Sequence, residues 1–147
     1  MARKPMGICI HWEKDMGAGE QFDKVWKISP REMNVKRFKV LGWCMSRLEL
    51  GYNDAIGSAI EVYFGKNQDG KGPFLDAVQF GERFIGGGGI VITGNTSTVT
   101  FNTNVVLPEP VPFDTDDVLY IFTTWINKRS DTQRFEMHLV VWLEVED

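Results

Sequence analysis

Apolar residues recur at every second position in several short segments of this chain. The clearest segment covers residues 135–145, where all six odd-numbered positions are apolar. Because successive side chains of a strand point to opposite faces, a period of two residues is typical of a half-buried β-strand. Comparable short runs, bounded by turn residues, cover 8–12, 22–28, 35–50, 60–64, 90–92, 98–107 and 118–125.

These runs predict an all-β fold, a two-sheet antiparallel sandwich of the jelly-roll kind with eight or nine strands. A hairpin-by-hairpin barrel is the alternative, but the polar connection 127–134 is longer than a tight hairpin needs and favours a step between sheets. Gly42 marks a candidate bulge within the long third run. Residues 74–85 are the best candidate for one short helix. The proline-rich segment 108–112 is expected to be extended and unpaired, and to cross between the sheets.

The length of 147 residues is typical of one domain, and we expect residues 1–147 to form a single β-sandwich domain. No apolar run reaches 18 residues, and the first residues lack the long apolar region of a signal peptide. We therefore expect a protein without a transmembrane segment that is made in the cytoplasm and is soluble. Cys9 and Cys44 lie within strand patterns and are predicted to be buried as small apolar side chains, and the sequence leaves open whether they pair.

Residues that could carry catalysis are few and scattered. His11 and His138 each stand between apolar neighbours in a strand, which favours solvent-facing or hydrogen-bonded side chains over metal ligands. The four glycines at 86–89 lack the lysine and the hydroxyl residue of a phosphate loop, so a hinge or a close backbone approach explains them better. The sequence thus predicts no catalytic residue, no metal site and no cofactor, and the chain is expected not to be an enzyme.

The charged residues give little indication of a charged ligand. Asp114, Asp116 and Asp117 form an acidic cluster before the run 118–125, which is interpreted as a solvated turn, with calcium binding as the alternative. The net charge is −4, and the N-terminus offers only Arg3 and Lys4 as a basic arm. Proteins that neutralise phosphates usually carry a basic patch or tail, so we do not expect nucleic acid as a partner.

Two segments carry more apolar surface than a lone sandwich needs. Residues 118–122 are apolar on both faces, and two apolar residues interrupt the polar side of 135–145. The core of a sandwich buries only one face of each sheet, so we expect either the segment 74–85 or another subunit to cover these side chains, and exposed apolar patches often mark interaction sites. We therefore predict a homo-oligomer, with four interface candidates: Tyr120, Phe122, Val140 and Trp142.

The chain resembles the small single jelly-roll proteins of virus and phage particles. The resemblance spans nearly the whole length and rests on the series of strands, the crossing 107–112 (LPEPVP), the segment 113–121 (FDTDDVLYI) and the long closing strand. It implies a non-enzymatic virion structural protein, a capsid or minor-shell subunit that binds copies of itself or other shell proteins. The missing basic arm departs from that pattern and implies a subunit facing proteins or a membrane instead of the genome.

The alternative function is a carbohydrate- or surface-binding β-sandwich module. Such a module would use loop residues and one exposed tryptophan to stack on a sugar ring or a host surface. The five tryptophans of the chain offer candidates, although core or interface packing is the favoured interpretation of them, since aromatic residues dominate the energetics of burial.

Overall fold

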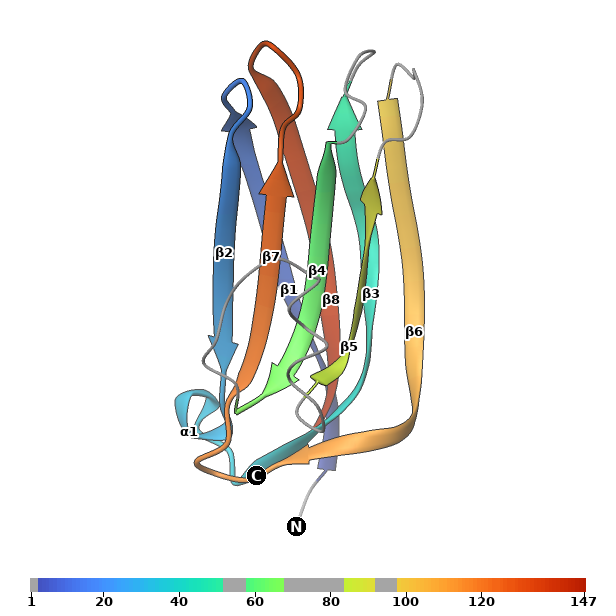
Figure 1. The fold of residues 1–147 in the computed structure, drawn as a ribbon. Coiled ribbons are helices and arrows are strands. Elements are labelled where there is room, and N and C mark those ends of the chain that lie inside the picture. Colours follow the sequence, from blue (N-terminus) through green and yellow to red (C-terminus); the bar gives the residue numbers. More distant parts are fainter. Residues whose placement is uncertain (1–2, 52–57, 68–83, 92–97) are drawn as a thin grey trace.

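The computed structural model describes residues 3–51, 58–67, 84–91 and 98–147 (Figure 1). Within these residues the chain forms eight strands and one helix of four residues. In chain order the elements are β1 (Arg3–Met16), β2 (Gln21–Ile28), α1 (Pro30–Met33), β3 (Arg37–Gly51), β4 (Ala59–Lys66), β5 (Phe84–Val91), β6 (Thr98–Phe113), β7 (Leu119–Ile126) and β8 (Gln133–Glu146). The all-β class is confirmed. Among the described residues no helix is long and apolar enough to cross a membrane.

The strands form two four-stranded antiparallel sheets that stack face to face (Figure 1). One sheet has the order β1-β8-β3-β6 and the other the order β2-β7-β4-β5. Of the described strands, only β4 and β5 are neighbours both along the chain and within a sheet, because the other connections step to the opposite sheet. This connectivity is that of a jelly roll. The hairpin-by-hairpin barrel is excluded, since β7 and β8 lie in different sheets.

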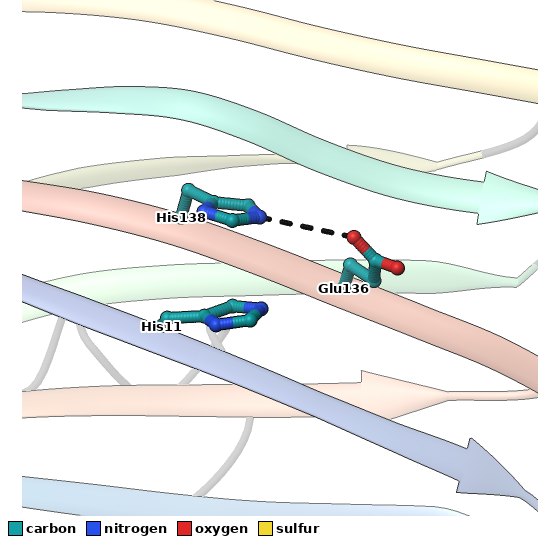
Figure 2. A group of neighbouring side chains, drawn as sticks. All are labelled: His11, Glu136 and His138. Carbon is teal, nitrogen blue, oxygen red and sulfur yellow. Dashed lines mark ion pairs between the residues drawn. The ribbon is translucent and has the colours of Figure 1, made fainter.

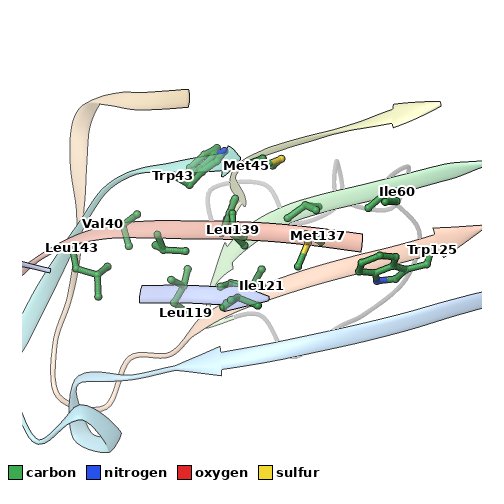
Figure 3. Close-up of a cluster of buried hydrophobic side chains, with 14 of the residues drawn as sticks. Val40, Trp43, Met45, Ile60, Leu119, Ile121, Trp125, Met137, Leu139 and Leu143 are labelled. Atoms are coloured by element: carbon green, nitrogen blue, oxygen red, sulfur yellow. The ribbon is translucent and has the colours of Figure 1, made fainter. Parts of the chain in front are cut away.

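The inward faces of the two sheets enclose one apolar core, to which β3, β4, β7 and β8 all contribute (Figure 3). The six odd-numbered residues of β8 from Phe135 to Val145 are all buried there, as the alternation predicted. Aromatic contacts join the sheets directly. The ring centroids of Trp43 and Phe64 lie 4.2 Å apart, and those of Trp125 and Phe135 lie 6.4 Å apart. Large aromatic side chains bury much apolar area, so these contacts contribute strongly to the packing of one sheet on the other.

A bulge at Gly42 changes which side of β3 faces the core. Val40 is buried before the bulge and Trp43 after it, although the two residues have opposite parity. The pairing register shifts at this point toward both neighbouring strands. A Cβ atom at Gly42 would lie 2.0 Å from the carbonyl oxygen of Val105, so only glycine fits. The predicted bulge is confirmed, and it turns Cys44 away from the core.

The glycine run 86–89 belongs to β5 and is paired with β4, so the predicted hinge was wrong. The alternative, a close approach, is confirmed. A Cβ atom at Gly86 would lie 2.6 Å from Cη2 of Trp43. Of the predicted helix at 74–85, residues 74–83 lie outside the described residues, and Phe84 and Ile85 begin β5.

The proline-rich segment 108–112 lies within β6 and is extended, as predicted. It is only partly unpaired, because Val111 and Pro112 lie opposite Val40 and Lys39 of β3. The crossing to the second sheet comes after this segment, between the end of β6 and the start of β7. Proline is tolerated here because β6 forms an edge of its sheet.

Asn127, which is fully buried, ties two connections together at one end of the sandwich. Its side-chain amide donates to the carbonyl oxygens of Met16 at 3.1 Å, Gly17 at 2.9 Å and Asp131 at 3.0 Å. Its Oδ1 accepts from the backbone N–H of Arg129 at 2.9 Å. One amide therefore satisfies polar backbone groups from the end of β1, from the turn that follows β1 and from the turn before β8.

Replacing Asn127 by alanine should lower the free energy of unfolding by about 2–4 kcal/mol, because one buried and three partly buried backbone groups lose their partner. Urea unfolding followed by tryptophan fluorescence measures the change. Asn104→Ala is the matched control, since Asn104 is exposed on β6 and its replacement should stay within about 0.5 kcal/mol. Equal effects of the two substitutions would contradict this role for Asn127.

Candidate functional site

The outward face of the β1-β8-β3-β6 sheet, called the outer face, carries most of the unusual side chains. Strand β8 lies in the interior of this sheet and is paired on both edges, with β1 and with β3. Because its odd-numbered residues fill the core, its even-numbered residues project outward. From 136 to 144 these residues are Glu136, His138, Val140, Trp142 and Glu144.

Trp142 is the most prominent apolar residue of the outer face. It lies in one row with Gly7 of β1, Gly42 of β3 and Val106 of β6. Trp142 is 45% exposed and Val106 is 77% exposed. A Cβ atom at Gly7 would lie 2.9 Å from Cζ3 of Trp142, so the missing side chain makes room for the indole. A shallow apolar hollow of about 260 Å³ is lined by five residues, called the apolar patch: Leu41, Gly42, Val105, Val106 and Trp142.

The two cysteines flank Val140 in the next row of the outer face. Cys9 of β1 and Cys44 of β3 both lie opposite Val140 of β8. Cys9 is exposed and Cys44 is half-buried, so the prediction that Cys9 is buried was wrong. Two strand spacings separate them, about 9.5 Å, which exceeds the Cα separation of about 7 Å that a disulfide tolerates. Both thiols are free.

One row further along, two histidines from opposite ends of the sequence come together (Figure 2). His11 of β1 lies directly opposite His138 of β8, and their rings stack with centroids 4.2 Å apart and planes 14° apart. Nε2 of His138 lies 3.7 Å from Oε2 of Glu136. One ligand atom from each of these three residues lies within 4.8 Å of the others. The sequence prediction treated the histidines as separate, because only the strand order makes β1 and β8 neighbours.

Ion pairs border the histidines. Arg134 of β8 pairs with Glu13 of β1, and its Nε lies 3.3 Å from Oε1 of Glu136. Glu13 also lies 3.7 Å from Nε2 of His11, measured from its Oε2. The hydrogen bond that Arg134 donates to Glu13, the largest influence, and the one that it donates to Glu136 raise the pKa of Arg134 above its ordinary value. The outer face thus changes along β8 from charged residues through histidine to the apolar patch.

The other two interface candidates lie on the second sheet. Phe122 of β7 is 1% exposed, and its ring stacks on Tyr63 of β4 with centroids 5.2 Å apart. Tyr120 is half-buried and lies 5.9 Å from the Phe122 ring, measured between centroids. These residues form a second apolar cluster, separate from the main core. That cluster accounts for the apolar character of residues 118–122 on both faces, and Phe122 offers almost no surface to a partner.

The aspartates before β7 form a hydrogen-bonded turn. Oδ2 of Asp117 accepts from the backbone N–H of Asp114 at 2.8 Å, and Oδ1 accepts from Nδ2 of Asn67 at 2.7 Å. Asp116 forms an ion pair with Arg31. Desolvation is the largest influence on the pKa of Asp117 and raises it. The hydrogen bonds from Asn67 and Asp114, together with the charge of Lys66, outweigh desolvation and hold the pKa below its ordinary value.

No protein-family model and no curated protein sequence matches this chain. Solved structures that it resembles include the decameric BFDV capsid protein, at 7% identity over 99% of this chain and 100% of that one, with a TM-score of 0.43. The turnip yellow mosaic virus structure follows at 11% identity over 98% and 82%, with a TM-score of 0.33. Latent PorU from Porphyromonas gingivalis matches at 12% identity and a TM-score of 0.46, covering 95% of this chain but 13% of PorU.

The strand order defines the chain as a jelly-roll β-sandwich. Viral capsid proteins are among the structures that it resembles, as the sequence pattern indicated. The bacterial PorU structure stands beside them at a comparable level of similarity.

Replacing Asp117 by asparagine should lower the free energy of unfolding at pH 7 by about 1 kcal/mol, since charge-assisted hydrogen bonds are lost. The folded pKa of Asp117 is depressed, so its stabilisation is present above the ordinary value of 3.8 and is lost as the pH falls through the folded pKa. Urea unfolding at pH 7, 5 and 3 should therefore show a difference that shrinks toward pH 3. Asp116→Asn, at an exposed position, is the control with little effect; an undiminished difference for Asp117→Asn at pH 3 would contradict the assignment.

Proposed function

We propose that this chain is a non-enzymatic structural subunit of a virion-type protein shell, which associates with copies of itself through the outer face. The observation that carries the proposal is the apolar patch around Trp142 on a sheet face that should be polar. The outward face of a sandwich meets water unless something covers it, so alternation with polar residues is the rule there. Trp142 and Val106 break this rule while 45% and 77% exposed.

A second copy of the chain is the partner that this surface suits best. Exposed apolar patches bordered by polar residues commonly mark protein interfaces, and tryptophan is prominent among the residues that dominate binding energy. Val140 extends the patch along β8, between the two cysteines. Tyr120 is a secondary candidate on the opposite sheet. The net charge of −4 favours contacts with protein over contacts with nucleic acid.

The proposed location depends on this role. As a shell subunit the chain would be made in the host cytoplasm and end in the virion. The jelly-roll fold is shared by many unrelated proteins, so the function is inferred from the surface residues and not from the fold.

Trp142→Glu should abolish self-association. A charge placed in the apolar patch, together with loss of the indole, should raise the dissociation constant at least about thirtyfold, because a central tryptophan contributes about 2 kcal/mol or more to an interface. Sedimentation velocity across a dilution series, supported by native mass spectrometry, measures the change.

Met6→Glu is the matched control for that experiment. Met6 is 38% exposed on the same sheet, but it lies on the other side of β1 from the outer face. The control should associate like the wild type. A wild-type chain that stays monomeric at the highest concentrations would overturn the proposal, and so would a Trp142→Glu chain that associates normally.

A carbohydrate-binding module is the second candidate, and the setting of Trp142 favours it. The indole lies between two glycines in its row, which gives it a flat surrounding suited to a sugar ring. A glycan array would then show binding that Trp142→Ala removes. If no glycan binds and the chain associates through Trp142, the result favours the shell subunit over the carbohydrate-binding module.

A further inference from the structure

We propose that His11, Glu136 and His138 form a binding site for one divalent transition-metal ion, with Zn²⁺ as the natural probe. The three residues project from the same face of the sheet, and in Figure 2 the two imidazole rings lie one over the other with Glu136 beside them. The site is distinct from the apolar patch, and the proposal does not depend on self-association.

The backbone fixes two of the three ligands relative to each other. His11 and His138 are directly opposed on paired antiparallel strands, where Cβ atoms lie about 5 Å apart. Glu136 precedes His138 by two residues on β8, so both side chains project from the same face. Neighbouring strand positions therefore bring all three ligands together without help from a loop.

The distances suit a small ion after minor side-chain movement. The three ligand atoms lie within 4.8 Å of one another. A tetrahedral ion with bonds of about 2.1 Å holds its ligand atoms about 3.4 Å apart. The side chains of His11 and His138 are 53% and 37% exposed, so they can turn toward a shared ion without displacing the core.

The donor set determines the class of ion. Two imidazole nitrogens and one carboxylate oxygen suit Zn²⁺, Ni²⁺, Co²⁺ and Cu²⁺, whereas Mg²⁺ and Ca²⁺ prefer sites made of oxygen alone. Three protein ligands leave at least one coordination position for water. Glu13 and Glu136 together outnumber Arg134, and this local negative charge favours a cation.

Neighbouring groups complete the surroundings of the ion. Glu13 lies 3.7 Å from His11, measured from Oε2 to Nε2, and can hold or orient that ring. Arg134 would keep its ion pair with Glu13 while Glu136 turns to the metal.

The ion would act as a clip between two strands. β1 forms an edge of its sheet and is hydrogen-bonded only to β8 among the described strands, so its attachment rests on that one ladder and on core packing. A metal ion held by His11 from β1 and by two residues from β8 adds a cross-link between them. Because the ion would bind the folded chain and not the unfolded chain, it would also raise the melting temperature.

The test uses the full chain without a histidine tag, stripped with a chelator and titrated with ZnCl₂ in a calorimeter. We expect one ion per chain, and a rise in melting temperature with the metal. His11→Ala and His138→Ala should each weaken binding by about tenfold or more. Co²⁺ should give the visible absorption of nitrogen and oxygen ligation, and hydrogen exchange of the β1 amides should slow.

Two control variants separate this site from other chemistry on the outer face. Cys9→Ser tests capture by the exposed thiol two residues from His11, and it should bind Zn²⁺ like the wild type. All titrations are repeated on the Trp142→Glu chain, so a failed assembly proposal leaves the metal result intact. Lack of saturable binding up to about 1 mM, which corresponds to roughly 4 kcal/mol, would overturn the proposal. Binding that both histidine variants retain would also overturn it.

Discussion

A strand that is paired on both edges can place its side chains only above or below the sheet, and this constraint on β8 determines both faces of its sheet. Its odd-numbered residues run through the core opposite the second sheet. Its even-numbered residues form the axis of the outer face, from Glu136 to Glu144. A shift of one residue in the register of β8 would turn its apolar residues outward and its charged residues into the core. The packing of the core therefore also determines which residues of β8 lie on the outer face.

The outer face combines features that a soluble sandwich does not need for stability. A charged cluster, two stacked histidines, two free cysteines around Val140 and the apolar patch succeed one another along β8. Strand order makes this possible, because it places the first strand of the chain beside the last. The two glycines that flank Trp142 in its row have no side chains, so the indole stays accessible.

Much of the fold could be predicted from the sequence because alternation reports directly on burial. The strands, the jelly-roll arrangement and the bulge at Gly42 were accessible in this way. The effect of that bulge on burial was not predictable, because the bulge reverses which positions of β3 face inward. Trp43 is therefore buried, whereas Cys44 faces outward. The glycine run left a hinge and a close backbone approach as alternatives, since composition does not reveal that β4 and Trp43 approach its backbone.

The candidate sites were less predictable, because they depend on which strands are neighbours. Trp142 and Val140 were identified from the sequence as apolar residues at outward positions, whereas Val106 and Leu41 join them only through the sheet order. His11 and His138 lie at opposite ends of the chain, and nothing local connects them. Both histidines occupy outward-facing positions of their strands, and a jelly-roll strand order makes those two strands neighbours. These two facts together would have predicted that the histidines meet.

The natural cysteines of the chain can report whether the outer face is covered by another molecule. Its two cysteines flank Val140 beside the apolar patch, so no substitution is needed to report on that surface. The most direct measurement is the alkylation rate of Cys9 in the unmodified protein as its concentration rises. We expect a rate that falls steadily as the chains associate through the outer face. A rate that stays the same at every concentration would contradict association through this surface.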